Sequence, residues 1–548
     1  MAKVGVDFGT TNSSIIMLLK DATGSLLARS LLDNNRNYER SLIYVQRTGE
    51  IKCGDEIDNN FLRLANNVGL IYNLKEKLLD ENFNSVFVCH GEKREWKDTQ
   101  VFNKTNDDKN IICYDKWQLL EKYMSYLLTK ANKSFYLNIE NDRITDVALS
   151  VPCSASADYI IKYKEVVEKA SVKDCNGKVY NVKVYDIIEE PVSIGLLSYK
   201  YGNSANYLIY DMGGGTLDIA IVSYSTKIYD VIDYDGNKRA GNYINEEILR
   251  YVFEKTNKNI NVTFREFNSV KNRELFKNLE SVDALKESMD SGIASWEEMG
   301  NQSIPIQLGF NGEELEEYCM SLNEYRNILK PIVKNNIMQC MELLNKHPTV
   351  FADVIVLAGG CCKSKIIADL IKENCQTLKI DNNTMDKVTA TAEGNAFLFN
   401  VHIEKLKRKL NNSYGVLCEE NGKHFIVNFA FKNEELPLNR TKTFRTSHST
   451  NEISLSFYCG NEIYCGNEIY CGNEIDLNKS IKDYNIQKYE RIKNVTVKYS
   501  FGKNIPKDTK MVIEFAIDKN GIFRIGVDSA ESLTGYREYE LNNMFKVK

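Results

Sequence analysis

Two glycine-rich turns, about 200 residues apart, constrain the fold of this 548-residue chain more than any other feature. The first is Asp7-Phe8-Gly9-Thr10-Thr11-Asn12-Ser13, in which the strand-like run 4–8 delivers Asp7. Gly9 permits a tight turn, and the backbone N–H groups and hydroxyls that follow can face phosphate oxygens. The pattern therefore predicts phosphate contacts from Gly9, Thr10, Thr11 and Asn12.

The second turn is Asp211-Met212-Gly213-Gly214-Gly215-Thr216-Leu217-Asp218. Without Cβ atoms, Gly213, Gly214 and Gly215 let the backbone approach a polyphosphate closely. Either turn alone is weak support, but two turns led by a strand-terminal aspartate indicate duplicated halves that clasp one nucleotide. We expect the carboxylates of Asp7 and Asp211 to hold Mg²⁺ mostly through water, since Mg²⁺ dehydrates reluctantly.

A third segment, Val354-Ile355-Val356-Leu357-Ala358-Gly359-Gly360-Cys361-Cys362-Lys363, runs as a buried-looking strand into two glycines before a helix. This geometry suits close packing against an adenosine. Gly359 and Gly360 are therefore candidate nucleotide contacts.

The first 400 residues alternate strand-like and helix-like segments, which is typical of an α/β domain. The predicted strands are 4–8, 146–151, 207–211 and 354–357, and the predicted helices are 116–131, 157–170 and 246–256. Residues 401–412 form a charged linker, in which we expect a helix over 402–410. Residues 413–548 read as a β-rich domain, with predicted strands at 423–431, 452–458, 495–501, 511–517 and 522–527.

The segment Tyr-Cys-Gly-Asn-Glu-Ile occurs three times, over residues 458–475. Its period is even, so additional copies preserve the in-and-out alternation of a strand. We interpret it as duplicated sequence that lengthens a hairpin or loop, with a thiol or binding role as the alternative.

The composition of the chain limits which binding partners and which cellular compartment we expect. The net charge of −5 gives no general reason to expect nucleic acid or an anionic membrane as a partner. The sequence has no uninterrupted run of about 18 apolar residues and no recognisable secretory signal at its start, so we expect a cytoplasmic protein. The 14 cysteines include no CxxC pair, and we expect reduced thiols, several of them buried, rather than zinc ligands.

Further segments make the chain resemble the 70-kDa heat-shock chaperone family within the actin-like ATPase superfamily. The resemblance covers nearly the whole sequence. The segments that carry it, beside the two turns and Gly359-Gly360, are Asn73–Leu78, Val151-Pro152, Ile187–Pro191, Ala240–Asn245, Leu436–Phe444 and Phe515–Ile522.

The resemblance implies a two-lobed, actin-like ATPase domain followed by an all-β substrate-binding sandwich without a helical lid. ATP would lie between the lobes with Mg²⁺, and K⁺ is a further candidate ion. Lys75 would orient the attacking water, and Glu190, Asp211, Thr216 and Asp218 would assist. The implied partners are unfolded or extended peptide segments, together with a J-domain protein and a nucleotide-exchange factor.

The chain departs from the family pattern at the adenine site. Glu287 and Lys363 stand where the family has two arginines that sandwich adenine. A glutamate offers no cation–π face, so we expect weaker nucleotide binding. Gly241 remains a candidate nucleotide contact through its family motif, and Asp283, Lys286 and Asp290 are candidates to reach the nucleoside.

Three functions remain open at this point. The first is an ATP-driven chaperone that binds unfolded segments. The second is a nucleotide-gated regulatory protein with little turnover, which the basic linker and the altered adenine site favour. The third is a small-molecule kinase or an actin-like filament protein, against which the β-rich domain argues.

Overall fold

The computed structural model describes most residues of the chain; the rest fall in several short gaps and two longer ones. The gaps are residues 33–36, 58–68, 81, 91–92, 100–110, 140–141, 198–204, 226–227, 257–272, 300–302, 311–312, 315, 376–377, 382–385, 400–405, 411, 421–422, 433, 461–488, 519–522 and 542–548. The three-copy repeat therefore lies largely outside the described residues.

Contacts divide the chain into two compact units, and each unit combines separate stretches of the sequence. The first combines residues 1–153, 162–226 and 234–402. The second combines residues 154–161, 227–233 and 403–548.

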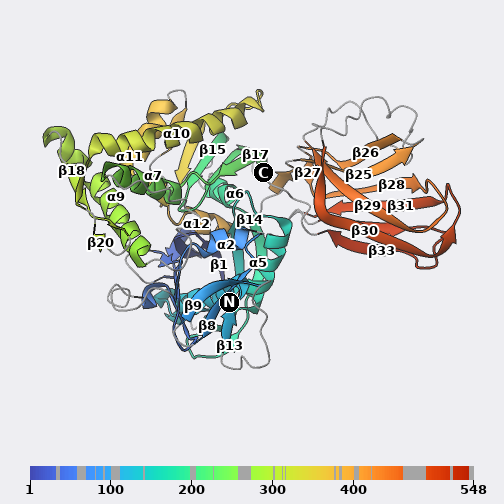
Figure 1. The fold of residues 1–548 in the computed structure, drawn as a ribbon, viewed down its shortest axis with the longest axis horizontal. Helices are drawn as coiled ribbons and strands as arrows, with labels where there is room; N and C mark the ends of the chain where they lie inside the picture. The colour runs from blue at the N-terminus through green and yellow to red at the C-terminus, as the bar shows by residue number, and fades with distance from the viewer. Residues whose placement is uncertain are drawn as a thin grey trace. The chain divides into compact units, whose positions relative to one another are not determined.

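The first unit contains a sheet with strand order β14-β11-β1-β2-β3, and β4 pairs with β2 (Figure 1). β1, β11 and β14 run parallel, whereas β1 and β2 form an antiparallel hairpin. The strands of this sheet are β1 (Ala2–Phe8), β2 (Asn12–Lys20), β3 (Leu26–Ser30), β4 (Glu39–Arg40), β11 (Ile144–Val151) and β14 (Lys183–Glu189).

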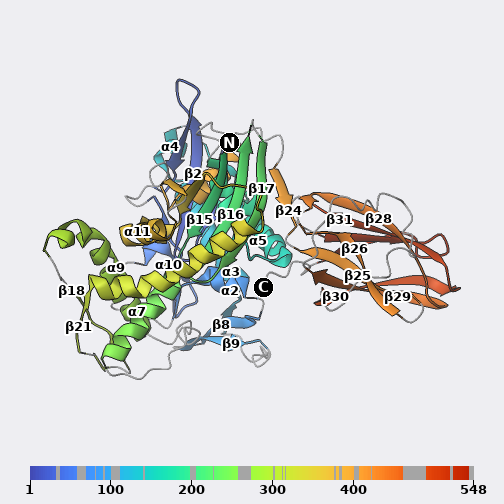
Figure 2. The same ribbon diagram turned by 90° about the horizontal axis from the view of Figure 1, so that it is seen from above.

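A second sheet repeats this pattern with strand order β23-β22-β15-β16-β17, and Figure 2 shows β15, β16 and β17 side by side. β15 and β16 form the antiparallel hairpin, and β22 and β23 continue the sheet in parallel from β15. Its strands are β15 (Ala205–Met212), β16 (Leu217–Ser225), β17 (Ile228–Asn237), β22 (Val354–Ala358) and β23 (Lys379–Asp381). The two predicted glycine turns therefore occupy equivalent places, each between the strands of a hairpin.

Three helices, α6, α10 and α12, pack against strands of the two sheets. α12 packs against β1, β2, β11 and α6, and its buried Asn395 donates hydrogen bonds to the Val6 carbonyl (2.9 Å) and to Ser150 Oγ (3.0 Å). Asp115 caps α3, and Ser321 caps α10. The helices are α2 (Leu74–Leu79), α3 (Lys116–Ala131), α4 (Phe135–Ile139), α5 (Ala157–Lys169), α6 (Glu190–Leu196), α7 (Gly241–Lys255), α9 (Arg273–Met299), α10 (Leu322–Asn345), α11 (Lys365–Asn374) and α12 (Ala390–Phe397).

Smaller sheets and two 3₁₀ turns complete the described part of the first unit. The 3₁₀ turns are η1 (Gly54–Glu56) and η4 (Gly360–Lys363). The small sheets are β6-β5-β7 (Ile51–Cys53, Ile43–Val45, Leu70–Ile71), β10-β8-β9 (Ile112–Tyr114, Ser85–His90, Lys93–Asp98), β12-β13 (Val172–Lys173, Val179–Tyr180), β18-β21 (Ser303–Ile306, Tyr318–Ser321) and β19-β20 (Gly309–Phe310, Glu313–Glu314).

The second unit is built mainly from two antiparallel sheets, with orders β26-β25-β29-β30 and β28-β31-β32-β33. Both sheets contribute to one apolar core, in which the rings of Phe429 and Phe515 stack at 4.2 Å. The strands are β25 (Ser413–Glu420), β26 (Lys423–Ala430), β28 (Leu438–Arg445), β29 (Thr450–Gly460), β30 (Tyr489–Ile505), β31 (Lys510–Ile517), β32 (Phe523–Asp528) and β33 (Arg537–Leu541). The fold thus has the expected α/β architecture followed by a β-rich region.

The helix predicted over 402–410 is wrong where the structure describes that segment. Residues Leu406–Lys409 form the strand β24, which pairs in parallel with Tyr229 and Asp230 of β17. On its other side, β24 pairs with β27 (Glu435–Leu436). Local helix propensity is a weak guide, and backbone pairing with two neighbouring segments overrides it.

Within the described residues, no helix is both long and apolar enough to cross a membrane. The cysteines of this part of the chain are free thiols. The prediction that several are buried is confirmed by Cys53, Cys89, Cys153, Cys340 and Cys362.

Candidate functional site

The first glycine turn joins β1 to β2. Asp7 lies opposite Ser14 and Phe8 opposite Ser13 in the hairpin, so the tip begins at Gly9. A Cβ added at Gly9 would lie 2.0 Å from the Asn12 carbonyl oxygen. This turn therefore closes only because the residue has no side chain.

The second turn joins β15 to β16 and lies directly against the first. Asp211 pairs with Asp218 at its base, and the Gly213 N–H donates to the Thr216 carbonyl at 3.0 Å. A Cβ added at Gly215 would lie 2.6 Å from Thr10 Oγ1, and one added at Gly214 would lie 2.8 Å from Thr11 Cγ2. The structure thus brings together two turns that are far apart in the sequence.

A group of buried charges lies beneath these turns. Lys75 on α2 forms an ion pair with Glu190 at the start of α6, and both side chains are almost fully buried. Burial, together with the nearby Glu190 carboxylate, raises the pKa of Asp7 to about 7 and that of Asp218 to about 7. Burial also raises the pKa of Asp211 well above its usual value, and the surrounding carboxylates add to that rise. Such crowding of carboxylates is unfavourable without a compensating cation.

Gly359 packs the third segment against the second turn. Its φ of 83° and ψ of 157° lie in a region that is essentially restricted to glycine. A Cβ there would lie 2.4 Å from the Met212 carbonyl oxygen and 2.5 Å from Asp211 Oδ1. Next to it, Cys361 Sγ donates to the Gly213 carbonyl at 3.1 Å.

A cavity of about 800 Å³ opens beside the two turns within the first unit. Predicted residues that line it are Thr10, Thr11, Asn12, Gly214, Gly241, Asp283, Lys286, Asp290, Gly360 and Lys363. The other predicted residues do not line it: Asp7, Gly9, Lys75, Glu190, Asp211, Gly213, Gly215, Thr216, Asp218 and Gly359. The predicted site residues therefore fall into two groups. One group lines the cavity, and the other consists of turn residues and charged residues that do not line it.

Charged side chains of α9 form another part of the cavity wall. The Lys286 ammonium donates to Asn245 Oδ1 and to Asp283 Oδ1, each at 2.9 Å. Ser364 Oγ donates to Asp290 Oδ1 at 2.7 Å. Glu287 also lines the cavity, and its side chain is exposed.

Several residues of the wall were not predicted as site residues from the sequence. They are Arg40, Ser41, Leu42, Tyr72, Asn73, Asn242, Ile244, Asn245, Leu279, Glu280, Ser291, Tyr325, Cys361, Ser364 and Ile367. Asn73, Asn242, Ile244, Asn245 and Cys361 belong to segments that the sequence had marked as motifs. The remaining wall residues carry no local pattern in the sequence, because separate elements bring them together.

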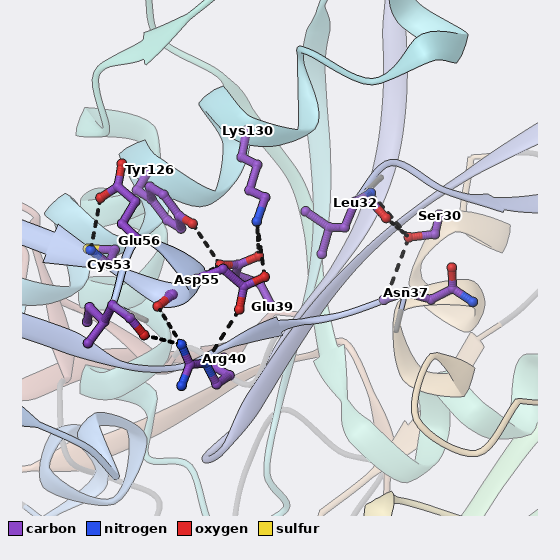
Figure 3. Close-up of polar contacts among 12 residues, drawn as sticks. Ser30, Leu32, Asn37, Glu39, Arg40, Cys53, Asp55, Glu56, Tyr126 and Lys130 are labelled. Atoms are coloured by element: carbon purple, nitrogen blue, oxygen red, sulfur yellow. Dashed lines mark hydrogen bonds and ion pairs between the residues drawn. The ribbon is translucent and has the colours of Figure 1, made fainter. Parts of the chain in front are cut away.

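A buried polar network supports the first turn (Figure 3). Glu39 on β4 is fully buried, pairs with Ser13, and accepts hydrogen bonds from Lys130 Nζ and from Tyr126 OH. The Ser41 N–H then donates to the Thr11 carbonyl at 2.8 Å. A buried carboxylate must be paired to be tolerated, so this network fixes β4 against the turn.

The donors at the cavity fit a nucleoside polyphosphate. Thr10 and Thr11 supply hydroxyl groups, and a Cβ added at Gly360 would meet nothing within 4 Å, so the wall is open there. Among the described residues, no group of three or more His, Cys, Asp or Glu side chains is arranged to hold a metal ion. Two carboxylates, Asp7 and Asp211, are still compatible with Mg²⁺, which proteins often hold through one or two carboxylates, water and substrate phosphates.

Comparisons with known proteins agree with this architecture. The sequence model of the family described as Hsp70 protein matches residues 3–465. Chaperone protein HscA of Buchnera aphidicola subsp. Baizongia pistaciae (strain Bp) is 21% identical over 456 residues, which cover 81% of this chain and 80% of the relative. Heat shock cognate 70 kDa protein 3 of Dictyostelium discoideum is 22% identical over 488 residues, covering 82% of this chain and 69% of the relative.

A third relative, the chaperone protein HscA homolog of Rickettsia prowazekii (strain Madrid E), is 25% identical over 398 residues. The match covers 69% of this chain and 53% of that relative. The Hsp70 family is an ATPase family that binds nucleotide. Because the family model extends over most of the chain, this protein belongs to the Hsp70 family.

Proposed function

We propose that this chain is an ATP-dependent molecular chaperone, in which hydrolysis of Mg²⁺-bound ATP controls the binding of unfolded, extended segments to the β-rich unit. The observation that carries the proposal is the contact between the two glycine turns at one cavity, directly above the buried Lys75–Glu190 pair. Family membership and the HscA relatives support the chaperone role.

The residues of the turns have complementary tasks in this proposal. Thr10 and Thr11 would donate hydrogen bonds to phosphate oxygens, while the glycines of the second turn let the backbone approach them. Asp7 and Asp211 would hold the cation through water. Bound Mg²⁺-ATP would supply the scissile phosphoanhydride bond and would offset the carboxylate charge.

Lys75 is the proposed catalytic residue. Its ammonium is held by the Glu190 carboxylate in a dry environment, where a fixed charge acts more strongly than in water. From there it would orient the attacking water and stabilise charge that develops on the terminal phosphate. Asp218 and Thr216 would help to hold the catalytic group in place. Asp218 is itself fixed, because its Oδ1 accepts a hydrogen bond from the Cys153 N–H at 2.8 Å.

The β-rich unit would bind the substrate. Its two antiparallel sheets share a core of stacked aromatic rings, which gives a rigid support for loops and strand edges. Extended segments bind such structures through backbone hydrogen bonds and side-chain pockets. A J-domain protein and a nucleotide-exchange factor would regulate the cycle.

The proposal is tested by steady-state ATP hydrolysis of the whole chain, with and without an unfolded peptide. We expect slow turnover that the peptide accelerates. Lys75→Ala should reduce it by about 100-fold or more, because the variant loses a charge that acts in the transition state. Nucleotide binding and thermal melting of the variant are measured in parallel, since the substitution leaves Glu190 buried without this partner.

Lys164→Ala is the matched control, because Lys164 is an exposed lysine on α5. It should hydrolyse ATP at the wild-type rate. Equal rates for wild type and Lys75→Ala would remove Lys75 from the mechanism.

A nucleotide-gated regulatory protein with little turnover is the second candidate. The observation that favours it is Glu287, a carboxylate on the cavity wall where the family pattern has an arginine. Nucleotide binding without measurable hydrolysis, unaffected by peptide, would support this candidate over the first.

A further inference from the structure

Asp290 on α9 is a carboxylate of the cavity wall that the proposed phosphate and cation contacts do not use. It accepts a hydrogen bond from Ser364 Oγ at 2.7 Å and another from the Ile366 N–H. The Ser364 hydroxyl in turn accepts from the Ile367 N–H at 3.2 Å, so its single proton is committed to Asp290. The start of α11 therefore holds the Asp290 carboxylate in a fixed orientation.

Asp290 can still accept further hydrogen bonds. A carboxylate accepts about four, and Ser364 and Ile366 supply two of them. Burial raises the pKa of Asp290, whereas these two hydrogen bonds and the nearby charge of Lys286 oppose that rise. Both hydrogen bonds favour the ionised form, which has no proton to donate. A ligand group that meets Asp290 must therefore supply the N–H or O–H.

The contacts of α9 give an order to the parts of a bound nucleotide. Lys286 Nζ donates to Asp283 Oδ1 and to Asn245 Oδ1 of α7, each at 2.9 Å. The first residue of α7, Gly241, donates its N–H to the second glycine turn at 3.1 Å. Asp290 lies two helical turns beyond Asp283, which is about 10 Å along the axis of α9. Because a carboxylate repels phosphate, the phosphates belong at the glycine turns, the ribose beside Asp283 and Lys286, and the base beside Asp290.

The chemistry of Asp290 distinguishes between bases. Among the four common bases, only guanine presents two adjacent donors, N1–H and the 2-amino group, which match the two oxygens of one carboxylate. Adenine and cytosine place an amino group beside a ring nitrogen that accepts. Uracil places one N–H between two carbonyls. In these three bases, an acceptor would therefore face a carboxylate oxygen, which is unfavourable.

We propose that Asp290 recognises the base of the bound nucleotide, and that the cavity accepts guanosine triphosphate in preference to adenosine triphosphate. This inference rests on the proposed nucleotide binding and extends the substrate of that site from ATP to GTP. Asp290 is a specificity-determining residue, whereas Ser364 is a positioning residue that acts through it.

Base preference is measured by calorimetric titration of the full chain with the Mg²⁺ complexes of GTP, ATP and inosine triphosphate. GTP should bind about tenfold or more tightly than ATP, which corresponds to one additional hydrogen bond to a charged group. Inosine triphosphate keeps N1–H but lacks the 2-amino group, so it should bind about fivefold or more weakly than GTP. Binding of ATP that equals or exceeds that of GTP would overturn the inference.

Asp290→Asn tests the hydrogen-bond pattern and keeps an acceptor for Ser364. An amide offers one oxygen and one NH₂ group, which match the N1–H and the 2-carbonyl of xanthine rather than the two donors of guanine. The variant should bind GTP about tenfold more weakly than wild type, and xanthosine triphosphate more tightly than GTP. Equal losses for ATP and GTP, without a gain for xanthosine triphosphate, would place Asp290 at the ribose and overturn the inference.

Glu373→Gln, at an exposed position of α11 that does not line the cavity, is the control for the loss of one negative charge. It should keep the wild-type preference for guanine. A chain that binds neither ATP nor GTP would overturn the proposed function and this inference together. Binding of ATP alone would overturn this inference and leave the proposed function standing.

Discussion

Two parts of the cavity wall in the first unit, the glycine turns and the α9 side chains, differ in what lines them. At the turns, backbone and small side chains meet at contact distance, with Gly214 and Gly215 against Thr11 and Thr10. At α9, charged side chains line the wall, and Glu287 is exposed there. Substitutions should therefore have large effects at the turns, where atoms have no room to move, and small ones at exposed positions such as Glu287.

The largest effect is expected for Gly359→Ala. The new Cβ would collide with Met212 and Asp211, and the backbone conformation is one that only glycine adopts easily. We expect a loss of about 3–5 kcal/mol in the stability of this unit and a clearly lower thermal midpoint.

Gly360→Ala is the matched comparison, because the adjacent glycine has nothing within 4 Å of an added Cβ. Its melting curve should resemble that of wild type. Similar destabilisation by both substitutions would mean that close packing of Gly359 is not the cause.

The second prediction concerns pH in protein free of nucleotide and Mg²⁺. Asp7 and Asp218 have pKa values raised from 3.8 to about 7, so these groups bind more protons in the folded than in the unfolded state. Stability should therefore fall as the pH rises between these values, by up to about 1.4 kcal/mol per pH unit for each group. Thermal melting from about pH 5 to about pH 7.5 measures it.

Asp218→Asn is the test variant for this prediction, since an amide oxygen can still accept the hydrogen bond from the Cys153 N–H. The variant should show a flatter dependence of the melting midpoint on pH. An unchanged dependence would show that other groups cause it.

The smallest effect is expected at Glu287. Glu287→Arg introduces a guanidinium that can stack on adenine, which contributes about 0.5–1 kcal/mol at an exposed site. Nucleotide affinity should rise about two- to fivefold, as measured by titration. Glu316→Arg, at an exposed position that does not line the cavity, is the control for the change in net charge. Equal gains in both variants would indicate a general electrostatic effect.

Much of the fold was predictable because local patterns specify it. The predicted helix over 116–131 has the same bounds as α3, since an apolar stripe and a capping aspartate define both its face and its start. The predicted strand at 511–517 is β31 to within one residue. By contrast, the segment 402–410 gave a helical pattern, whereas its described part is a strand determined by its neighbours.

The candidate site was predictable only in part. Turns such as Gly9–Asn12 can be recognised in the sequence, because glycine and hydroxyl residues are needed at fixed places in one short segment. Glu39 gave no such signal, and Glu76 and Asn242 lie in recognised segments that did not reveal their contact with each other. Their roles depend on partners more than 80 positions away, such as Tyr126 for Glu39.

The sequence by itself determined the two hairpin turns, the alternation of strands and helices, and the β-rich character of residues 413–548. Each depends on interactions within a few residues, which the chain encodes locally. Only the tertiary structure decided that the turns touch, that Lys75 is buried against Glu190, and that Glu76 meets Asn242. These contacts depend on how whole sheets and helices pack, because burial and charge pairing are properties of the assembled unit rather than of any segment.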